Sequence, residues 1–464
     1  MSTFHCLGKS KSNTNLQFRK PNRFTIVYIS SVIFTIIFFV AIGLFIRNTR
    51  RIIRNIKLGR KTVRSDQKIK RWKHMIRVAL GQSKMTVRPV AGLLHIIVYV
   101  GFIVINIELL EIVLDGFLGT HRVLSPYLGS TYNVFIATFE IFAFMVIIAV
   151  TFFWLRRNAI RIRRFWKPEM KGWPKKDADF ILYIELVLMF LFLTMNASDN
   201  WLQQHPDGQS YYTQVGHFPI SSWITPIFDG MSYASVVYIE RTSWWLHIIG
   251  ILAFLNYLYY SKHLHILLAF PNTFYANLNP LGKFSHSEAV ANEVKLMLDP
   301  SVDPYGATPV ENEQKSFGAA DVKDLNWVQL MNSYSCTECG RCTDVCPANQ
   351  TGKKLSPRKI MMDTRDRLEQ AGKQLDQGLE IDNNSLLDNY ISREELWACT
   401  TCNACVEACP ISIDPLSIII DMRQYLVLEQ SSAPTELNAM MTNIENNGAP
   451  WPFNQQDRLN WSKE

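Results

Sequence analysis

The chain has 464 residues, of which 48% are hydrophobic, and a formal net charge of +8 at neutral pH. The charge is unevenly divided, because residues 1–270 carry 32 Lys and Arg against 13 Asp and Glu, whereas residues 271–464 carry 16 against 27. The basic residues stand between long apolar runs, and no helix-turn-helix or zinc-finger pattern accompanies them. This excludes a nucleic-acid partner and favours a membrane lipid surface.

Five apolar stretches in the first part of the chain are each long enough to cross the ~30 Å apolar core of a bilayer as a helix. They cover residues 24–46, 90–114, 132–155, 180–197 and 244–270. The sequence therefore predicts a mainly α protein. Its first domain, residues 24–270, is predicted to be a five-helix transmembrane bundle.

The loops between these stretches predict the orientation in the membrane. Loops 47–89 and 156–178 hold fifteen and nine Lys and Arg, whereas loops 115–131 and 198–243 hold one each. Positively charged loops stay in the cytoplasm. In a bacterial inner membrane, the N-terminal tail (1–23) is therefore expected outside and everything after the fifth span inside.

The soluble part begins after the fifth span. Residues 271–320 contain a Pro-, Asp- and Gly-rich stretch and are expected to form a linker. Residues 321–464 are expected to form a cytoplasmic, α-helical ferredoxin-like domain. Helix formers and helical spacing predict helices over 358–371 and 416–428.

Eight of the nine cysteines form two runs of one spacing, C-x₂-C-x₂-C-x₃-C-P, placed 63 residues apart. This is the spacing of bacterial two-cluster ferredoxins, in which the fourth cysteine ligates the other cluster. We therefore expect one [4Fe–4S] cluster on Cys336, Cys339, Cys342 and Cys409, and a second on Cys399, Cys402, Cys405 and Cys346. Structural zinc would need separated cysteine pairs rather than triplets, and Cys6 has no partner motif.

Histidines inside apolar spans are candidate ligands, because ionisable groups are costly in a bilayer. His95 on the second span and His265 on the fifth are expected at one depth near the cytoplasmic face, which suits the axial ligands of a b-type haem. His247, about 27 Å along the same helix at 1.5 Å per residue, is a ligand for a possible second haem, with His121 its first candidate partner. His263 is expected to face another side. A hydrogen bond within the bundle is the alternative for each histidine.

Four glutamates also lie in or near the spans: Glu108, Glu111, Glu140 and Glu185. Each is expected either to pair within the bundle or to take part in a proton path or a quinone-binding site. Quinone chemistry takes up two protons with two electrons, so it needs such groups beside a redox cofactor.

With these residues in view, residues 24–270 resemble the cytochrome b subunit of respiratory nitrate reductase and the related membrane subunit of heterodisulfide reductase. The resemblance rests on five spans, an outside N-terminus, the Leu94-His95 pair and two histidines 18 residues apart. It implies an inner haem on His95 and His265. The family's second histidine on the His95 helix falls here at Ile105, which leaves the outer haem open.

Residues 320–464 resemble the dicluster subunit of heterodisulfide reductase and the C subunit of anaerobic glycerol-3-phosphate dehydrogenase. The segment 443–451 is similar to the C-terminal signature of that family. This resemblance implies a separate iron–sulfur partner protein that carries the cysteine-rich CCG domain.

Taken together, the sequence predicts a membrane-bound oxidoreductase subunit that passes electrons between a cytoplasmic partner and the quinone pool. The cofactors would be two [4Fe–4S] clusters and haem b, with quinone as the diffusible substrate. The donor would be a flavoprotein or a dehydrogenase, substrate chemistry would lie in a partner, and no catalytic residue is assigned. A haem-free membrane anchor and a subunit of a disulfide reductase are the alternatives.

Overall fold

The computed structural model of the chain describes residues 23–208, 211–284, 288–299, 301 and 317–463. The mainly α prediction is confirmed, since the only β pairing in these residues consists of two isolated bridges, Arg60–Asn326 and Leu387–Ile391. The predicted N-terminal tail with Cys6, except for its last residue, and segment 302–316 of the predicted linker lie outside the described residues.

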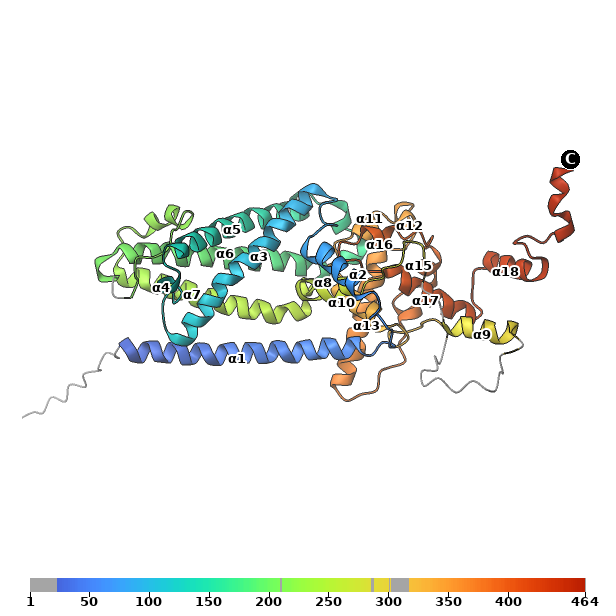
Figure 1. Ribbon diagram of the computed structural model, residues 1–464, viewed down its shortest axis with the longest axis horizontal. Coiled ribbons are helices and arrows are strands. Elements are labelled where there is room, and N and C mark those ends of the chain that lie inside the picture. The colour runs from blue at the N-terminus through green and yellow to red at the C-terminus, as the bar shows by residue number, and fades with distance from the viewer. Residues whose placement is uncertain (1–22, 209–210, 285–287, 300, 302–316, 464) are drawn as a thin grey trace, which may run out of the picture.

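The first part of the chain is a bundle of long helices that run alongside one another (Figure 1). They are α1 (Arg23–Ile56), α3 (Pro89–Leu118), α5 (Ser130–Trp154), α6 (Trp173–Gln204) and α7 (Tyr233–Tyr257). Within the described residues, four helices are long and apolar enough to cross a membrane, and they correspond to α1, α3, α5 and α6. The helix α7, which carries Glu240 and Arg241, packs against α6 but is not one of these four.

The fifth predicted span, 244–270, is not one helix. The helix α7 begins at Tyr233 and ends at Tyr257, two 3₁₀ turns follow at 258–260 and 262–264, and α8 (His265–Phe274) is a separate helix. Ser261 breaks the path with an extended backbone (φ −112°, ψ 147°), and its hydroxyl accepts a hydrogen bond from the His263 amide at 3.0 Å. The prediction that His247 and His265 lie on one helix is therefore wrong. The span was placed by its overall apolar content, although the polar run Ser261-Lys262-His263 stands at the break.

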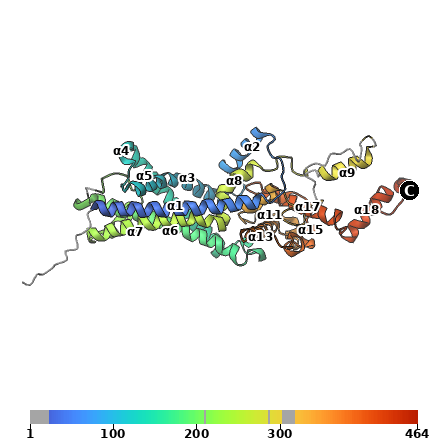
Figure 2. The same ribbon diagram turned by 90° about the horizontal axis from the view of Figure 1, so that it is seen from below.

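The helix α1 extends beyond the bundle. Its 34 residues span about 51 Å at 1.5 Å per residue, which exceeds the ~30 Å apolar core. Figure 2 shows it running the length of the bundle and reaching the second domain. There, Arg54 donates to Asp376 at 2.5 Å and the Asn55 amide donates to the Tyr334 hydroxyl at 3.0 Å.

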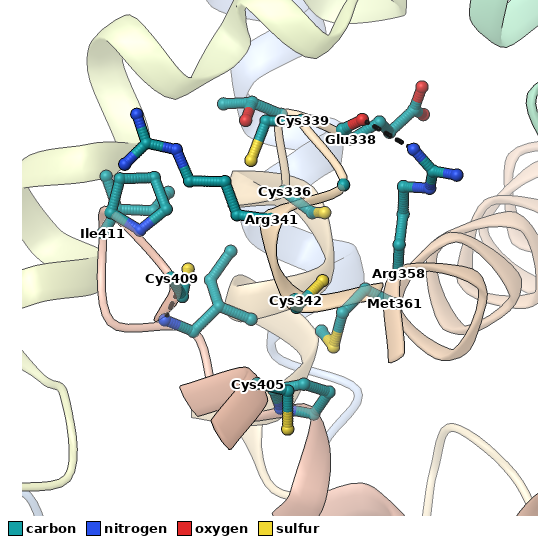
Figure 3. A pocket seen from close by; sticks show the side chains of 15 residues that line it. Cys336, Glu338, Cys339, Arg341, Cys342, Arg358, Met361, Cys405, Cys409 and Ile411 are labelled. Atoms are coloured by element: carbon teal, nitrogen blue, oxygen red, sulfur yellow. Dashed lines mark hydrogen bonds between the residues drawn. The ribbon is translucent and has the colours of Figure 1, made fainter. Parts of the chain in front are cut away.

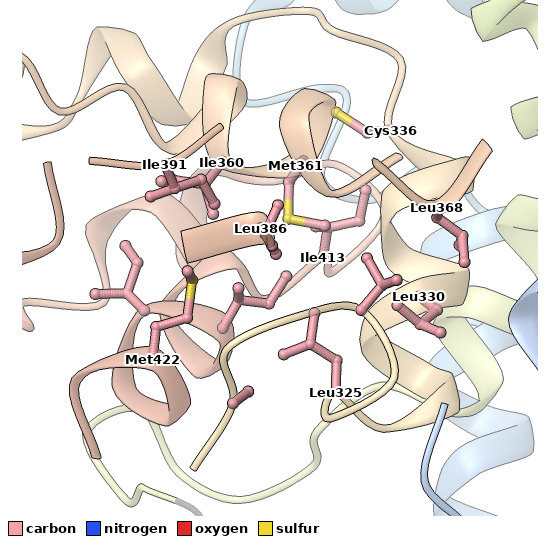
Figure 4. Packing of buried hydrophobic residues seen from close by; sticks show 14 of the residues in the cluster. Leu325, Leu330, Cys336, Ile360, Met361, Leu368, Leu386, Ile391, Ile413 and Met422 are labelled. Carbon is pink, nitrogen blue, oxygen red and sulfur yellow. The ribbon is translucent and has the colours of Figure 1, made fainter. Parts of the chain in front are cut away.

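The second domain is a set of short helices around two longer ones, α13 (Pro357–Asp376) and α17 (Pro415–Leu428). These two confirm the helices predicted over 358–371 and 416–428. The shorter helices are α10 (Trp327–Ser335), α11 (Arg341–Asp344), α12 (Pro347–Gln350), α14 (Leu386–Asn389), α15 (Arg393–Trp397) and α16 (Ala404–Ala408). Figure 4 shows part of the hydrophobic core that they enclose.

The core of the second domain is continuous with the end of the bundle. Ile52 of α1 and Leu258 and Leu264 of the broken segment belong to the same buried cluster as Leu330 and Met422. The two domains therefore share apolar packing, and the helix end, the 3₁₀ turns and the cluster domain form one junction. The helices α9 (Glu288–Leu298) and α18 (Thr435–Asn447) lie away from this body (Figure 1).

Candidate iron–sulfur and haem-ligating sites

The two cysteine runs adopt the same backbone. Glu338 and Gly340 in the first run have φ angles of 53° and 73°, and Thr401 and Asn403 in the second have 56° and 61°. In each run these residues stand directly before and directly after the second cysteine. Left-handed residues turn successive backbone N–H groups into a concave surface that favours negative charge. The sequence repeat is therefore also a structural repeat.

Gly340 shows why the left-handed position is restrictive. A Cβ atom at Gly340 would lie 2.5 Å from Nη1 of the buried Arg358 side chain. Glycine meets both requirements, because it accepts a positive φ and leaves room for the guanidinium. In the second run the same position is Asn403, one of the few residues that visit the left-handed region readily.

The first run and the end of the second run surround one pocket (Figure 3). Its cysteines are Cys336, Cys339, Cys342 and Cys409, with Cys405 also on its lining. Apolar side chains, including Met361, Ile411 and Ile413, complete the wall. The structure therefore brings together the four cysteines that the spacing assigned to the first cluster.

The other four cysteines are also neighbours. Cys399 interacts electrostatically with Cys346 and Cys402, and Cys405 interacts with all three. Cys342 and Cys405 connect the two groups. Cys402 is exposed, whereas Cys346 and Cys405 are buried. The second group thus lies beside the first and reaches the surface at Cys402.

Two groups of four cysteines match the number of ligands that two [4Fe–4S] clusters need. Among the described residues, no three His, Cys, Asp or Glu side chains converge on a single ion position. Burial raises the pKa of Cys336 to about 12 and that of Cys409 to about 11, so these sulfurs ionise near neutral pH only when a cation binds them. Backbone N–H groups of Thr401 and Ile413 donate to the sulfurs of Cys399 and Cys409 at 3.4 Å and 3.3 Å. Such N–H···S contacts stabilise the negative charge of an iron–sulfur cluster.

Glu338 ties the first cysteine run to the rest of the junction. Its carboxylate is 4% exposed and pairs with Lys262 of the second 3₁₀ turn and with Arg365 of α13, the latter at 2.8 Å. Burial alone would raise the pKa of Glu338, but the two cations more than offset this and lower it. Glu338 is therefore a charged group that holds three segments together.

The first pocket also contacts the segment that leads into α3. Lys84 donates to the carbonyl oxygen of Cys409 at 3.2 Å, and Arg341 donates to the carbonyl oxygen of Lys84 at 3.0 Å. His74 and Ser412 are hydrogen-bonded at 3.1 Å. Basic side chains of the predicted cytoplasmic loop therefore face the first pocket.

Three histidines gather at the same junction. The rings of His263 and His265 are 5.3 Å apart between centroids, and both histidines interact electrostatically with His95. The broken helix explains why His263 does not face away as a continuous helix would require. His263 also lies 3.5 Å from Glu185, which places that glutamate at the junction.

The hydrogen bonds of these histidines suit a metal-bound group. Nδ1 of His265 contacts the Lys262 carbonyl oxygen at 3.1 Å, which leaves Nε2 available to a metal. An Nδ1–H to carbonyl contact is the usual way in which a ligating histidine is oriented. Nδ1 of His95 is buried without a hydrogen-bond partner among the described residues. His265 meets this criterion, whereas His95 has a ring nitrogen without a partner in the described part of the chain, and haem ligation by His95 and His265 stays a prediction.

His247 and His121 have different partners. Nδ1 of His247 contacts the Leu188 carbonyl oxygen at 3.0 Å, whereas Nε2 of His121 faces Asp199 at 3.2 Å. Because Nε2 of His121 is already paired, this arrangement does not fit His121 as a haem ligand beside His247. His247 remains a predicted ligand with no identified partner.

The sequence analysis missed a buried polar network at the end of the bundle opposite the cysteines. Arg122, 6% exposed, donates to Asp199 at 2.7 Å, to Asn196 at 3.0 Å and to Tyr132 at 3.2 Å. Three of the four predicted glutamates, Glu108, Glu111 and Glu140, surround this group. Arg122 is the only basic residue in loop 115–131, a signal that could have marked it.

Comparison with known proteins supports the iron–sulfur domain. Residues 335–413 match the family described as the 4Fe-4S dicluster domain. The probable iron-sulfur-binding oxidoreductase FadF of Bacillus subtilis is 28% identical over 94% of this chain and 61% of its own length. The EtfAB:quinone oxidoreductase of Syntrophomonas wolfei is 25% identical over 83% of this chain and 53% of its own.

A protein of Archaeoglobus profundus described as similar to the C subunit of heterodisulfide reductase is 30% identical over 27% of this chain and 55% of its own length. The chain therefore spans less than two thirds of each of these relatives. No solved structure matches it. The matched domain and the four apolar helices define a membrane-associated iron–sulfur protein with an oxidoreductase-related role in electron transfer. The predicted resemblance of residues 320–464 to heterodisulfide reductase is supported.

Proposed function

We propose that this chain relays electrons between a cytoplasmic redox partner and the quinone pool of a bacterial inner membrane, with its N-terminus outside. The proposed cofactors are two [4Fe–4S] clusters and a b-type haem. The first cluster would be held by Cys336, Cys339, Cys342 and Cys409, and the second by Cys399, Cys402, Cys405 and Cys346. The proposed haem ligands are His95 and His265.

The observation that carries the proposal is the position of the first pocket. It lies at the junction, where Arg341 lines the pocket and also acts electrostatically on His95. The second cysteine group lies on the other side and reaches the surface at Cys402. This order suits a path from an external partner, through two clusters, to a haem at the membrane boundary.

The side chains around the first pocket also suit electron transfer. Each cluster supplies a one-electron carrier when it is bound. Arg341 and the buried Arg358 line the pocket, and Lys84 donates to the Cys409 carbonyl oxygen. Arg358 is paired with Glu169, and the Glu338 carboxylate lines the same pocket, so these negative charges partly offset the cations. Positive charge close to a bound cluster would favour its reduced, more negative state.

Two relatives support the proposed quinone and the proposed partners. One relative is named an EtfAB:quinone oxidoreductase, which supports quinone as the substrate and a flavoprotein as the donor. The similarity to the C subunit of heterodisulfide reductase supports a second iron–sulfur protein, of the CCG type, as a partner. Substrate chemistry would then take place in a partner, and this chain would be the membrane-bound relay.

The haem assignment is tested by visible and EPR spectroscopy of single variants of the full chain. His95→Ala and His265→Ala should each abolish the b-type haem spectrum and leave both cluster signals intact, because no cysteine is changed. His247→Ala is the contrasting variant, because it should leave the spectrum nearly intact if the chain holds one haem. A loss of about half of the haem absorbance would instead show a second haem. A full haem spectrum in His95→Ala, or haem-free wild-type protein, would reject the cytochrome assignment.

A further inference from the structure

The polar network around Arg122 is built into the end of the bundle that lies away from the cysteines. Arg122 has a left-handed backbone with φ of 53°, an unfavourable conformation for a residue with a side chain. Its amide donates to Asp115 at 2.8 Å, and the Thr120 hydroxyl and Val123 amide donate to the same carboxylate at 2.6 Å and 3.1 Å. Asp115 therefore fixes this connection so that Arg122 points into the bundle.

The network contains more acids than bases. Four carboxyl groups are buried in this network: Glu108 and Glu111 of α3, Glu140 of α5 and Asp199 of α6. Glu108 and Asp199 pair with Arg122, whereas Glu111 and Glu140 are linked to it through Tyr132 and Asn196. Among the residues that the structure describes, the only other base in contact is His121, which faces Asp199 at 3.2 Å. If all four carboxyl groups were ionised, the network would carry an uncompensated negative charge in a low-dielectric interior, which is costly. At least one carboxyl group must therefore hold a proton.

Three of the four carboxyl groups have donors that stabilise a negative charge. Glu111 accepts from the Leu124 amide at 2.9 Å and from the Tyr132 hydroxyl at 2.7 Å. Glu140 accepts from the amides of Ile220 and Ser221 at 2.9 Å and 3.1 Å and from Asn196 at 3.2 Å. Asp199 accepts from Arg122 at 2.7 Å.

Glu108 differs from these three. It is 3% exposed, its Oε1 lies 3.9 Å from Arg122, and its Oε2 has no hydrogen-bond partner among the described residues. A buried carboxylate without a donor is unfavourable, whereas a protonated carboxyl group is neutral and has an O–H to donate. Glu108 is therefore the acid of this network that holds the proton.

A route for this proton leads towards the distal surface, at the end of the bundle that lies away from the cysteines. Arg122 keeps its own protons, because a guanidinium is not deprotonated in proteins. Asp199 interacts electrostatically with Glu108 and also faces His121 at 3.2 Å, and the His121 ring packs against Tyr211 and Tyr212. A histidine ring has two nitrogens, so it can accept a proton on one and release a proton from the other. His121 and Asp199 thus connect the interior of the network with the outer end of the bundle.

We propose that Glu108 is a proton-loading group that exchanges its proton with the distal surface through Asp199 and His121. On release, the Glu108 O–H bond breaks and the proton passes by way of Asp199 and the His121 imidazole to solvent, and loading is the reverse. Its coupling to electron transfer rests on the proposed function, since a quinone takes up two protons with two electrons. The inference that Glu108 holds a proton does not depend on the proposed function.

The test uses the full chain in nanodiscs and infrared difference spectroscopy on exchange from H₂O to D₂O. Wild-type protein should show the carbonyl stretch of a protonated carboxylic acid that shifts in D₂O, and Glu108→Gln should lack it. Glu111→Gln, one turn further along α3, should keep the band, because both Glu111 oxygens already accept hydrogen bonds, from the Leu124 amide and the Tyr132 hydroxyl. The proposal is overturned if the band persists in Glu108→Gln or is lost in Glu111→Gln.

Stability gives an independent readout that does not need redox activity. Glutamine mimics a protonated glutamate, so Glu108→Gln should unfold close to the wild-type temperature, whereas Glu111→Gln and Asp199→Asn should unfold at clearly lower temperatures. The proposal would be contradicted if Glu108→Gln unfolded at a much lower temperature than wild type while Glu111→Gln kept the wild-type unfolding temperature. His121→Ala should slow D₂O exchange of the Glu108 band several-fold, and unchanged exchange would reject the route.

Discussion

At the scale of single residues, Glu338 combines two demands. Its backbone has a positive φ that shapes the first cysteine run, and its buried carboxylate neutralises Lys262 and Arg365. A residue chosen only for its left-handed backbone would be glycine or asparagine, as at Gly340 and Asn403. The unfavourable backbone conformation of Glu338 is tolerated because its carboxylate links the cysteine loop to Lys262 of the 3₁₀ turn and to Arg365 of α13.

Glu338→Gln should therefore destabilise the protein. The amide keeps the size of the side chain but leaves Lys262 and Arg365 with only their longer contacts to Asp177 at 3.9 Å and Asp366 at 3.5 Å. Breaking a buried ion pair costs about 3–5 kcal/mol, and these remaining contacts reduce the loss. We expect a lower thermal unfolding temperature and weakened retention of the first cluster. Lys354→Gln is the control, because its exposed pair with Glu394 contributes little. Equal unfolding temperatures for the two variants would contradict the role of Glu338.

The second prediction at this scale is that the fourth cysteine of each run ligates the cluster held by the other run. Cys409→Ser should damage the cluster held by Cys336, Cys339 and Cys342, because Cys409 shares their pocket. Cys346→Ser is the matched variant and should damage the other cluster. EPR of the reduced protein measures both signals. If each substitution instead affected the cluster of its own run, the assignment would be wrong.

At the scale of secondary-structure elements, the junction depends on contacts between segments far apart in the sequence. Arg358 of α13 is fully buried and donates to Glu169 at 2.7 Å and to the Arg164 carbonyl oxygen at 2.8 Å. Both partners lie in the basic connection between α5 and α6. A loop predicted only as a membrane-facing positive segment is thus also a docking surface for the cluster domain.

The helix α17 carries a pH-dependent contribution to stability. Asp421 accepts a hydrogen bond from Gln329 at 2.7 Å, and burial raises its pKa from 3.8 to about 6. A raised pKa means that the folded state binds the proton more tightly, so the stability that this group contributes is present at low pH and is lost as the pH rises through about 6. The shift of about two units corresponds to at most about 3 kcal/mol, reduced by the partial exposure of Asp421.

Asp421→Asn should therefore raise the unfolding temperature at pH 8 and have a smaller effect at pH 5.5, because asparagine keeps the acceptor and has no charge to bury. Asp382→Asn should act in the opposite direction. The pKa of Asp382 is lowered, since Gln374 and Arg367 outweigh its desolvation, and the variant loses these charged contacts. Anaerobic thermal melts at both pH values measure the two effects. A lower unfolding temperature of Asp421→Asn at pH 8 would contradict the burial argument.

At the scale of the whole molecule, the features that depend on residues close together in the sequence were predicted. The features that depend on contacts between distant segments were not. Cysteine spacing predicted which cysteines form the two groups, and helix formers predicted α13 and α17, because these features depend on residues close together in the sequence. The break at Ser261 and the approach of His263 to His265 were missed because the span was placed by the overall apolar content of residues 244–270, although the polar run Ser261-Lys262-His263 interrupts it. The network of Arg122 also escaped prediction, since it joins residues from three helices that only the folded bundle brings together.

The central claim is that electrons pass between the cysteine domain and the quinone pool through the junction. The most direct measurement reduces the clusters of the full chain in quinone-containing nanodiscs and follows quinol formation. Wild-type protein should form quinol, and His95→Ala should keep reducible clusters but form almost none. Quinol formation at the wild-type rate in His95→Ala, or reduced clusters that never deliver electrons in the wild type, would contradict the account.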